Sequence, residues 1–115
     1  MSDQCLFCRI VAGEIPATVV RDDPDTLAFR DIDPKAPVHV LVIPKAHHPD
    51  AAAVLAADPG LLVEIYATAV EVAQQEGIAD SGYRAVFNTG ADGGQTVHHA
   101  HLHLLGGRGL TWPPG

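Results

Sequence analysis

Four of the seven histidines in the chain lie within six positions, in the segment HHAHLHLLGG at residues 98–107. If this segment is a strand, its side chains alternate between two faces, so that His99, His101 and His103 share one face and apolar residues take the other. Three imidazoles on one face of an otherwise apolar strand are costly to bury without a function. The pattern therefore indicates a functional site rather than a chance run of exposed histidines.

Metal binding and nucleophilic catalysis are the two chemistries that such histidines could perform. The Cα atoms of His99 and His103 would lie about 13 Å apart at about 3.3 Å per residue, which two imidazoles with metal bonds of about 2 Å barely span. Two of the three could share an ion, but not all three in good geometry. A neutral imidazole, with an ordinary pKa of about 6.5, is a nucleophile at cellular pH without a separate base. Its neighbours could orient it, bond phosphate oxygens or protonate a leaving group.

The glycine-rich segment NTGADGGQT, residues 88–96, directly precedes these histidines. Gly90, Gly93 and Gly94 allow tight turns and a close approach of the backbone to a ligand. Successive backbone N–H groups in such a loop can hold an anion, and Thr96 adds a hydroxyl donor. Taken alone the segment fits an ordinary hairpin turn, but its position before the histidines favours a phosphate loop.

Cys5 and Cys8 are the only two cysteines, and their spacing suits a shared metal or a redox pair. The pair alone is weak support, because buried or incidental thiols fit equally well. Tetrahedral zinc needs four ligands. The spacing does not choose which two residues complete the set among His47, His48, His98 and His99.

Asp31, in the segment FRDI, follows an apolar run near the expected end of a strand. A carboxylate there could accept hydrogen bonds from two vicinal hydroxyls, as in a ribose. The ordinary alternative is a solvated surface aspartate.

The elements that must position these residues form one domain, residues 1–115, of the α+β class built on an antiparallel sheet. His39 is the one polar residue inside a strongly apolar run, and Leu6, Ile10 and Val11 fall on one side of the first helix. The pattern predicts a short helix that begins near residue 5 and is ended by Gly13, and a main helix in 58–78 with Asp58 as its N-cap and Gly77 as its stop. Strands are predicted at 17–23, 26–32, 38–45, 83–88 and 99–107.

Net charge excludes some partners. The chain carries a formal charge of -7 with only seven Lys and Arg, so it lacks the basic stripe that a nucleic-acid polymer requires. One mononucleotide could still be held by a few backbone donors. The sequence has no apolar run of membrane-spanning length and no secretory leader, which predicts a cytoplasmic protein without a structural disulfide.

The motif HAHLHLL resembles the His-x-His-x-His-x-x signature, with apolar x, of the histidine-triad (HIT) nucleotide-binding family. The likeness extends over GEIPA, LAFRDIDPKAPVHVLVIPK and GYRAVFNTGADGGQT, and the closing GGRGLTWPPG is similar to the Hint branch. The resemblance implies a single HIT domain with about five antiparallel strands, one long helix and one or two short helices. It also implies a two-fold homodimer, with the contact at YATAVEVA and residues 83–88, and Trp112 in a tail that reaches the partner's site.

The resemblance implies a role for each matching position. His101 would be the nucleophile that attacks the α-phosphate, with His99, His103 and His39 as the other catalytic histidines. Asp31 would bind the ribose. The apolar slot for the base would consist of Leu6, Phe7, Ile10, Phe29 and Ile32, and the phosphate loop of Asn88, Gly94, Gln95 and Thr96.

The cysteine pair matches the bacterial members of the family. The resemblance implies a structural zinc held by Cys5, Cys8, His47 and His99, and no metal in catalysis. The sequence departs from the family at His98, where the family usually has an aromatic residue.

We therefore expect a hydrolase that cleaves purine nucleoside phosphoramidates or adenylates at the α-phosphate through a nucleotidyl-histidine intermediate. The purine mononucleotide would be its small-molecule partner. One alternative is a non-catalytic nucleotide-binding regulatory protein, and a less favoured one is a metal-handling protein. Turnover of adenosine 5′-phosphoramidate separates the first two.

Overall fold

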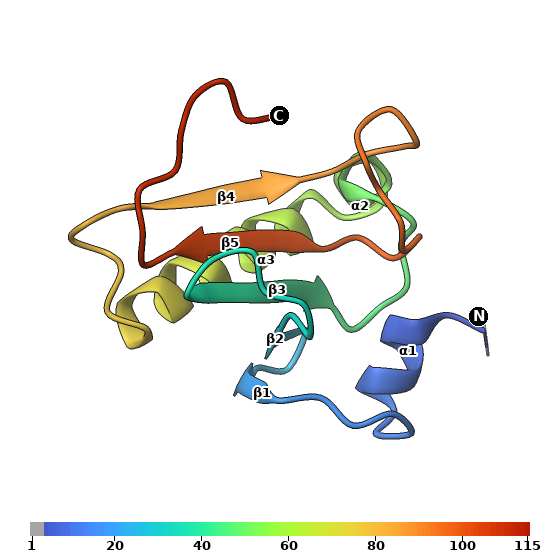
Figure 1. Cartoon of the computed structure of the whole chain (residues 1–115). Coiled ribbons are helices and arrows are strands. Elements are labelled where there is room, and N and C mark those ends of the chain that lie inside the picture. The colour runs from blue at the N-terminus through green and yellow to red at the C-terminus, as the bar shows by residue number, and fades with distance from the viewer. Residues whose placement is uncertain (1–3) are drawn as a thin grey trace.

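Residues 4–115 are described by the computed structural model and form a five-stranded antiparallel sheet with three helices (Figure 1). The strand order is β1-β2-β3-β5-β4, so β3 and β5 lie inside the sheet and β4 is an edge. Within this part of the chain, no helix has the length and apolar character to cross a membrane. The elements are α1 (Leu6–Val11), β1 (Val19–Asp22), β2 (Thr26–Arg30), β3 (Val38–Pro44), α2 (Ala51–Ala57), α3 (Pro59–Gln75), β4 (Tyr83–Phe87) and β5 (Leu102–Gly106).

Both faces of the sheet are covered, and they are covered differently. The even-numbered residues of β3 and β5 point into the main core beneath α3, which runs behind these strands in Figure 1. The odd-numbered side chains of β3 point to the opposite face, where Leu41 and Ile43 pack with Phe7 of α1. Because His39 and His103 are odd-numbered, both lie on the face that α1 partly covers.

The two adjoining helices begin at aspartate caps. Asp50 precedes α2 and Asp58 precedes α3, and each carboxylate accepts a hydrogen bond from the backbone N–H three residues later. Pro59 occupies the first turn of α3, and Gly77 follows its end with φ +74°. The sequence predicted α3 well. It did not place α2, because an alanine-rich segment carries no apolar stripe.

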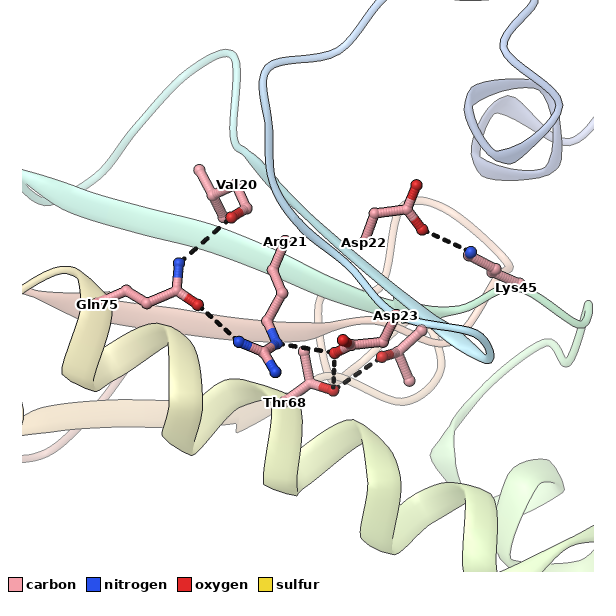
Figure 2. A network of polar contacts seen from close by, with 8 residues as sticks. Val20, Arg21, Asp22, Asp23, Lys45, Thr68 and Gln75 are labelled. Carbon is pink, nitrogen blue, oxygen red and sulfur yellow. Dashed lines mark hydrogen bonds and ion pairs between the residues drawn. The ribbon is translucent and has the colours of Figure 1, made fainter.

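A polar network fastens β1 and the following turn to α3 (Figure 2). The Arg21 guanidinium donates from Nε to Asp23 Oδ2 (2.8 Å) and from Nη1 to Gln75 Oε1 (2.9 Å). The Thr68 hydroxyl lies 2.8 Å from the Thr26 hydroxyl and donates to Asp23 at 3.4 Å. The network lies on the α3 side of the sheet, away from the histidines.

The predicted strand at 99–107 begins later than expected, at Leu102. Leu102 pairs with β3 and with Phe87, the last residue of β4. Beyond that point β4 ends, and β3 finishes at Pro44, which has no N–H to donate. Residues 99–101 therefore lack ladder partners, and strand alternation does not orient His99 and His101.

The first helix ends just before Gly13, as the sequence predicted, but it buries a different residue. It ends at Val11, and its buried side chain is Phe7, whereas Leu6 is 43% exposed. A helix of six residues has too little apolar periodicity to reveal its buried face. This difference matters because Phe7 contacts the histidines.

Candidate functional site

His39 of β3 and His103 of β5 form a directly bonded pair, with 3.0 Å between His39 Nε2 and His103 Nδ1. The backbone N–H of Lys35 donates to His39 Nδ1 at 3.0 Å. An N–H donor can bond only to an unprotonated ring nitrogen, so the His39 proton must be on Nε2 in the neutral ring. His39 therefore donates to His103, which leaves the His103 proton on its own Nε2.

His101 is oriented by the backbone of its neighbour. Its Nδ1 lies 2.7 Å from the carbonyl oxygen of His99, an acceptor, so Nδ1 carries the proton. The lone pair of neutral His101 is consequently on Nε2. The ring also packs against Phe7, with 5.1 Å between ring centroids in an edge-to-face arrangement, and lies 4.9 Å from the His103 ring. These contacts bring together the rings that the strand pattern alone does not align.

Burial keeps these imidazoles neutral. Desolvation lowers the pKa of His103 to about 4, with smaller contributions from the charges of His101 and His39. Desolvation is also the main cause that lowers the pKa of His101 and of His39. At neutral pH the site therefore offers an unprotonated nitrogen on His101 beside an N–H donor on His103.

The low pKa of His103 predicts a loss of stability in acid. Between about pH 6.5 and pH 4, a histidine in the unfolded chain binds a proton while folded His103 stays neutral, so the free energy of unfolding falls as pH falls. The His103→Asn variant should lose less stability than the unmodified protein over this range. Urea unfolding at several pH values measures the difference. The matched control His98→Asn removes an exposed histidine and should follow the unmodified protein; an equally steep decline in His103→Asn would contradict the assignment.

An apolar cavity of about 420 Å³ lies beside His101 and His103. Thr96 and Asp31 also line it. Ile32 lies at its rim, with 99% of its side chain exposed. All five residues that the sequence assigned to the base slot line this cavity, namely Leu6, Phe7, Ile10, Phe29 and Ile32.

Asp31 is oriented where β2 has ended. Its Oδ1 accepts a hydrogen bond from the N–H of Asp33 at 2.8 Å, and its Oδ2 lies 3.5 Å from His39 Nε2. Its backbone N–H donates to the carbonyl of His39. The carboxylate is thus held between the apolar cavity and the histidine pair.

The glycine-rich loop has a compact structure of its own. A Cβ on Gly93 would lie 2.5 Å from the carbonyl oxygen of Thr89, and Gly94 has φ +84°, so both positions require glycine. The N–H groups of Gly94 and Gln95 donate to carbonyls within the loop. The Gln95 side chain accepts from Gly90 and donates to two further carbonyls. Gly94 and Gln95 therefore shape the loop rather than present donors toward a ligand.

Asn88, also assigned to the phosphate loop, lines a second cavity, of about 600 Å³. His103 and Asp31 line both cavities, so the two adjoin at these residues. The second cavity is bounded by β4 and by the segment after β5, and Arg84 and Arg108 line it. Neither arginine stands out in the sequence, because isolated cations form no recognisable pattern.

Cys5, Cys8, His47 and His99 meet in one cluster. His99 Nδ1 lies 3.4 Å from Cys5 Sγ, 3.6 Å from Cys8 Sγ and 3.3 Å from His47 Nδ1, and Cys8 Sγ lies 3.4 Å from His47 Nδ1. Tetrahedral zinc, with bonds of about 2.0–2.1 Å to nitrogen and 2.3 Å to sulfur, places two nitrogens about 3.3–3.4 Å apart and nitrogen and sulfur about 3.5 Å apart. The donor set and its spacing therefore fit zinc. His48 and His98, the other two histidines that the sequence left open, are outside the cluster.

His99 presents the correct nitrogen to this cluster. It is completely buried, and its Nε2 lies 2.8 Å from the carbonyl oxygen of Pro44, so Nε2 carries the proton and the Nδ1 lone pair is available to a metal. Because the His99 carbonyl accepts from His101, this residue connects the metal-binding cluster to the catalytic candidates.

Asp31, His39 and His103 also have polar atoms within 4.8 Å of one another. A metal at His39 Nε2 would require the ring proton to move to Nδ1. Two N–H donors, those of His39 and Lys35, would then face each other and the present hydrogen bond would be lost. The arrangement is therefore better described as a hydrogen-bonded network than as a second metal site.

A histidine cluster that borders an apolar cavity on one face of a five-stranded antiparallel sheet is the arrangement of histidine-triad proteins. The sequence model described as the HIT domain matches residues 12–110, and this chain belongs to that family. The family resemblance and the α+β fold predicted from the sequence are thereby confirmed.

Relatives and solved structures agree with this assignment. A HIT family hydrolase from Legionella pneumophila Philadelphia 1 superposes with a TM-score of 0.94 at 56% identity, over 97% of this chain and 100% of that one. The chain is 44% identical to the purine nucleoside phosphoramidase of Escherichia coli K12 over 96% of its own length and 92% of that protein. It is 49% identical to a 14 kDa zinc-binding protein of Zea mays, over 96% and 87% of the two chains.

Proposed function

We propose that this protein hydrolyses purine nucleoside 5′-phosphoramidates, or adenylates, at the α-phosphate. The observation that carries the proposal is the protonation of His101: its Nδ1 proton is held by the His99 carbonyl, so its Nε2 lone pair is available for attack. Similarity to the Escherichia coli phosphoramidase supports the same substrate class.

In the proposed reaction, the base lies in the apolar cavity against Phe7 and Phe29, and the Asp31 carboxylate accepts from the ribose hydroxyls. His101 Nε2 forms a bond to the α-phosphorus as the P–N bond breaks, and the leaving nitrogen takes a proton from water. The Nε2–H of His103 donates to a phosphate oxygen, and His39 maintains that protonation. Water then attacks the phosphorus, the bond to His101 breaks, and the nucleoside monophosphate is released with loss of one proton.

The direct test is turnover of adenosine 5′-phosphoramidate by the purified protein, with AMP and ammonia as products. AMP binding without turnover would support the regulatory alternative and reject the enzyme. A protein that binds zinc tightly but shows no nucleotide effect on its melting temperature would support the metal-handling alternative.

We also propose that zinc occupies the Cys5, Cys8, His47 and His99 cluster in a structural role. Two thiolates and two imidazoles complete a tetrahedral set, with no position left for a reactive water. Zinc there would tie α1 to the segment that carries His101. His101, His103 and His39 are not ligands, so the proposed reaction uses no metal.

We infer that residues 1–115 form one HIT domain and that two chains associate about a two-fold axis. The thiols must stay reduced to bind zinc, which favours the cytoplasm.

The proposed contact between the two chains is at strand β4, which has an unpaired edge. Beside it lies an apolar groove of about 430 Å³ lined by Leu62, Val63, Tyr66, Ala85, Phe87 and Leu102.

A charge in this groove should separate the two chains. Val63 is 68% exposed, so Val63→Lys is tolerable in a folded monomer, but it would bury a charge in the proposed interface. Light scattering should give twice the 12.1 kDa of one chain for the unmodified protein and one chain's mass for the variant. Leu55→Lys, at a 54% exposed position on α2, is the matched control and should remain dimeric. A monomeric unmodified protein at micromolar concentration would contradict the proposal.

A further inference from the structure

The seven Lys and Arg side chains of this acidic protein differ in whether they form an ion pair. Among residues 4–115, five of the seven Lys and Arg form ion pairs with a carboxylate, at 2.6–3.6 Å. Within the same described range, Arg84 and Arg108 form none. In a chain with a net charge of -7, two guanidinium groups without an acidic partner are an exception. The five paired cations are Arg9, Arg21, Arg30, Lys35 and Lys45.

Arg84 and Arg108 line the same cavity, the 600 Å³ space beside His103. Backbone carbonyls hold both: Arg84 Nη2 donates to Thr111 at 2.8 Å, and Arg108 donates from Nη2 to Lys35 at 2.8 Å and from Nη1 to Gly109 at 3.0 Å. These bonds orient the guanidinium groups without neutralising their charge. Each group also retains N–H donors that these carbonyls do not use.

The position of this cavity defines what it could receive. The apolar cavity on the other side of His103 and Asp31 is the proposed site of the nucleoside, so the phosphorus would lie at the junction of the two. The group expelled from phosphorus would then leave toward the cavity that Arg84 and Arg108 line. Among the residues that the structure describes, Asp31, at the junction, is the only acidic side chain that lines it.

We propose, on the basis of the phosphoramidase function proposed above, that this second cavity binds the leaving group and selects amines that carry a carboxylate. Such substrates are nucleoside 5′-phosphoramidates of amino acids. The planar guanidinium group matches the two oxygens of a carboxylate and binds them with charge-assisted hydrogen bonds. When the P–N bond breaks, the nitrogen takes a proton from water and the amino acid departs with its carboxylate unchanged.

The test compares two leaving groups of similar size, one with a carboxylate and the other with a neutral amide in its place. Adenosine 5′-phosphoramidates of glycine and of glycinamide are assayed, and the ratio of their kcat/KM values is determined for each variant. Because the same two amines are used throughout, their different basicities cancel when variants are compared. Arg84→Gln combined with Arg108→Gln should lower the ratio about tenfold, the size of a lost charge-assisted hydrogen bond. Arg84→Lys should retain more of the ratio than Arg84→Gln.

The matched control is Arg21→Gln, since Arg21 is also a guanidinium on the sheet but lies against α3 (Figure 2) and should leave the ratio unchanged. Raising the ionic strength should lower the ratio for the unmodified protein, because salt screens partly exposed charges; this arm needs no variant to fold. An unchanged ratio in the double variant, or equal losses in Arg84→Lys and Arg84→Gln, would overturn the selection of carboxylates. Failure to cleave unsubstituted adenosine 5′-phosphoramidate would instead overturn the function on which it rests.

Discussion

Replacing His101 by alanine is expected to lower the turnover of adenosine 5′-phosphoramidate by roughly 10⁴-fold or more, since it removes the proposed nucleophile. The reason is geometric. His101 donates its Nδ1 proton to the His99 carbonyl, so its lone pair is on Nε2 and is available to attack phosphorus. His103 has its proton on Nε2 and cannot replace it without reversing the chain of bonds from Lys35 through His39.

The same variant should still bind AMP, because the apolar cavity and Asp31 remain. Steady-state assays measure the loss of turnover, and calorimetric titration with AMP measures the retained affinity. His98→Ala is the matched control: this histidine is exposed, belongs to the same segment and lies outside the metal-binding cluster. Turnover by His101→Ala near that of the unmodified protein would reject the covalent mechanism.

Removing the proposed zinc should produce the largest change in stability. Zinc analysis should give one ion per chain for protein purified without chelator. Chelation or Cys8→Ser should lower the melting temperature by more than about 10 °C, because metal binding contributes directly to folding and about 1 kcal/mol corresponds to about 4–8 °C in a small domain. Hydrogen exchange should then increase in α1, because Cys5 is its N-cap and Cys8 lies in its first turn.

The loss of zinc should affect turnover less than the loss of His101 does, since neither His101 nor His103 is a ligand. His48→Ala is the matched control, because His48 adjoins His47 but its ring is outside the cluster. A chain without zinc, or a Cys8→Ser variant that melts with the unmodified protein, would reject the assignment.

The sequence predicted what depends on periodicity and on residue type. The aspartate cap and the glycine stop located α3, and the resemblance assigned His39 to the catalytic histidines. The spacing of Cys5 and Cys8 suited a shared metal or a redox pair, and the resemblance implied that His47 and His99 complete the set. Sequence reasoning reaches these features because each depends on the types and positions of side chains.

What the sequence could not predict depends on backbone groups. The Lys35 N–H and the carbonyls of His99 and Pro44 determine which ring nitrogen carries each proton, and any residue type supplies such groups. The late start of β5 follows from where its neighbours end. The inward orientation of Gln95 depends on carbonyls of Pro49 and Val97 that come close only in the folded loop.

Phe7 forms a wall shared by two sites. It lies between Cys5 and Cys8 in the sequence, and its ring packs edge-on against His99, His101 and Phe29. If the proposed zinc holds Phe7 in place, the free energy that it contributes there would also strengthen binding of the proposed nucleotide. Thermodynamic reciprocity requires that nucleotide would then strengthen zinc binding by the same factor. Protein with bound nucleotide would therefore lose zinc last when zinc is scarce. The fraction of molecules that hold zinc would then rise with the concentration of nucleotide.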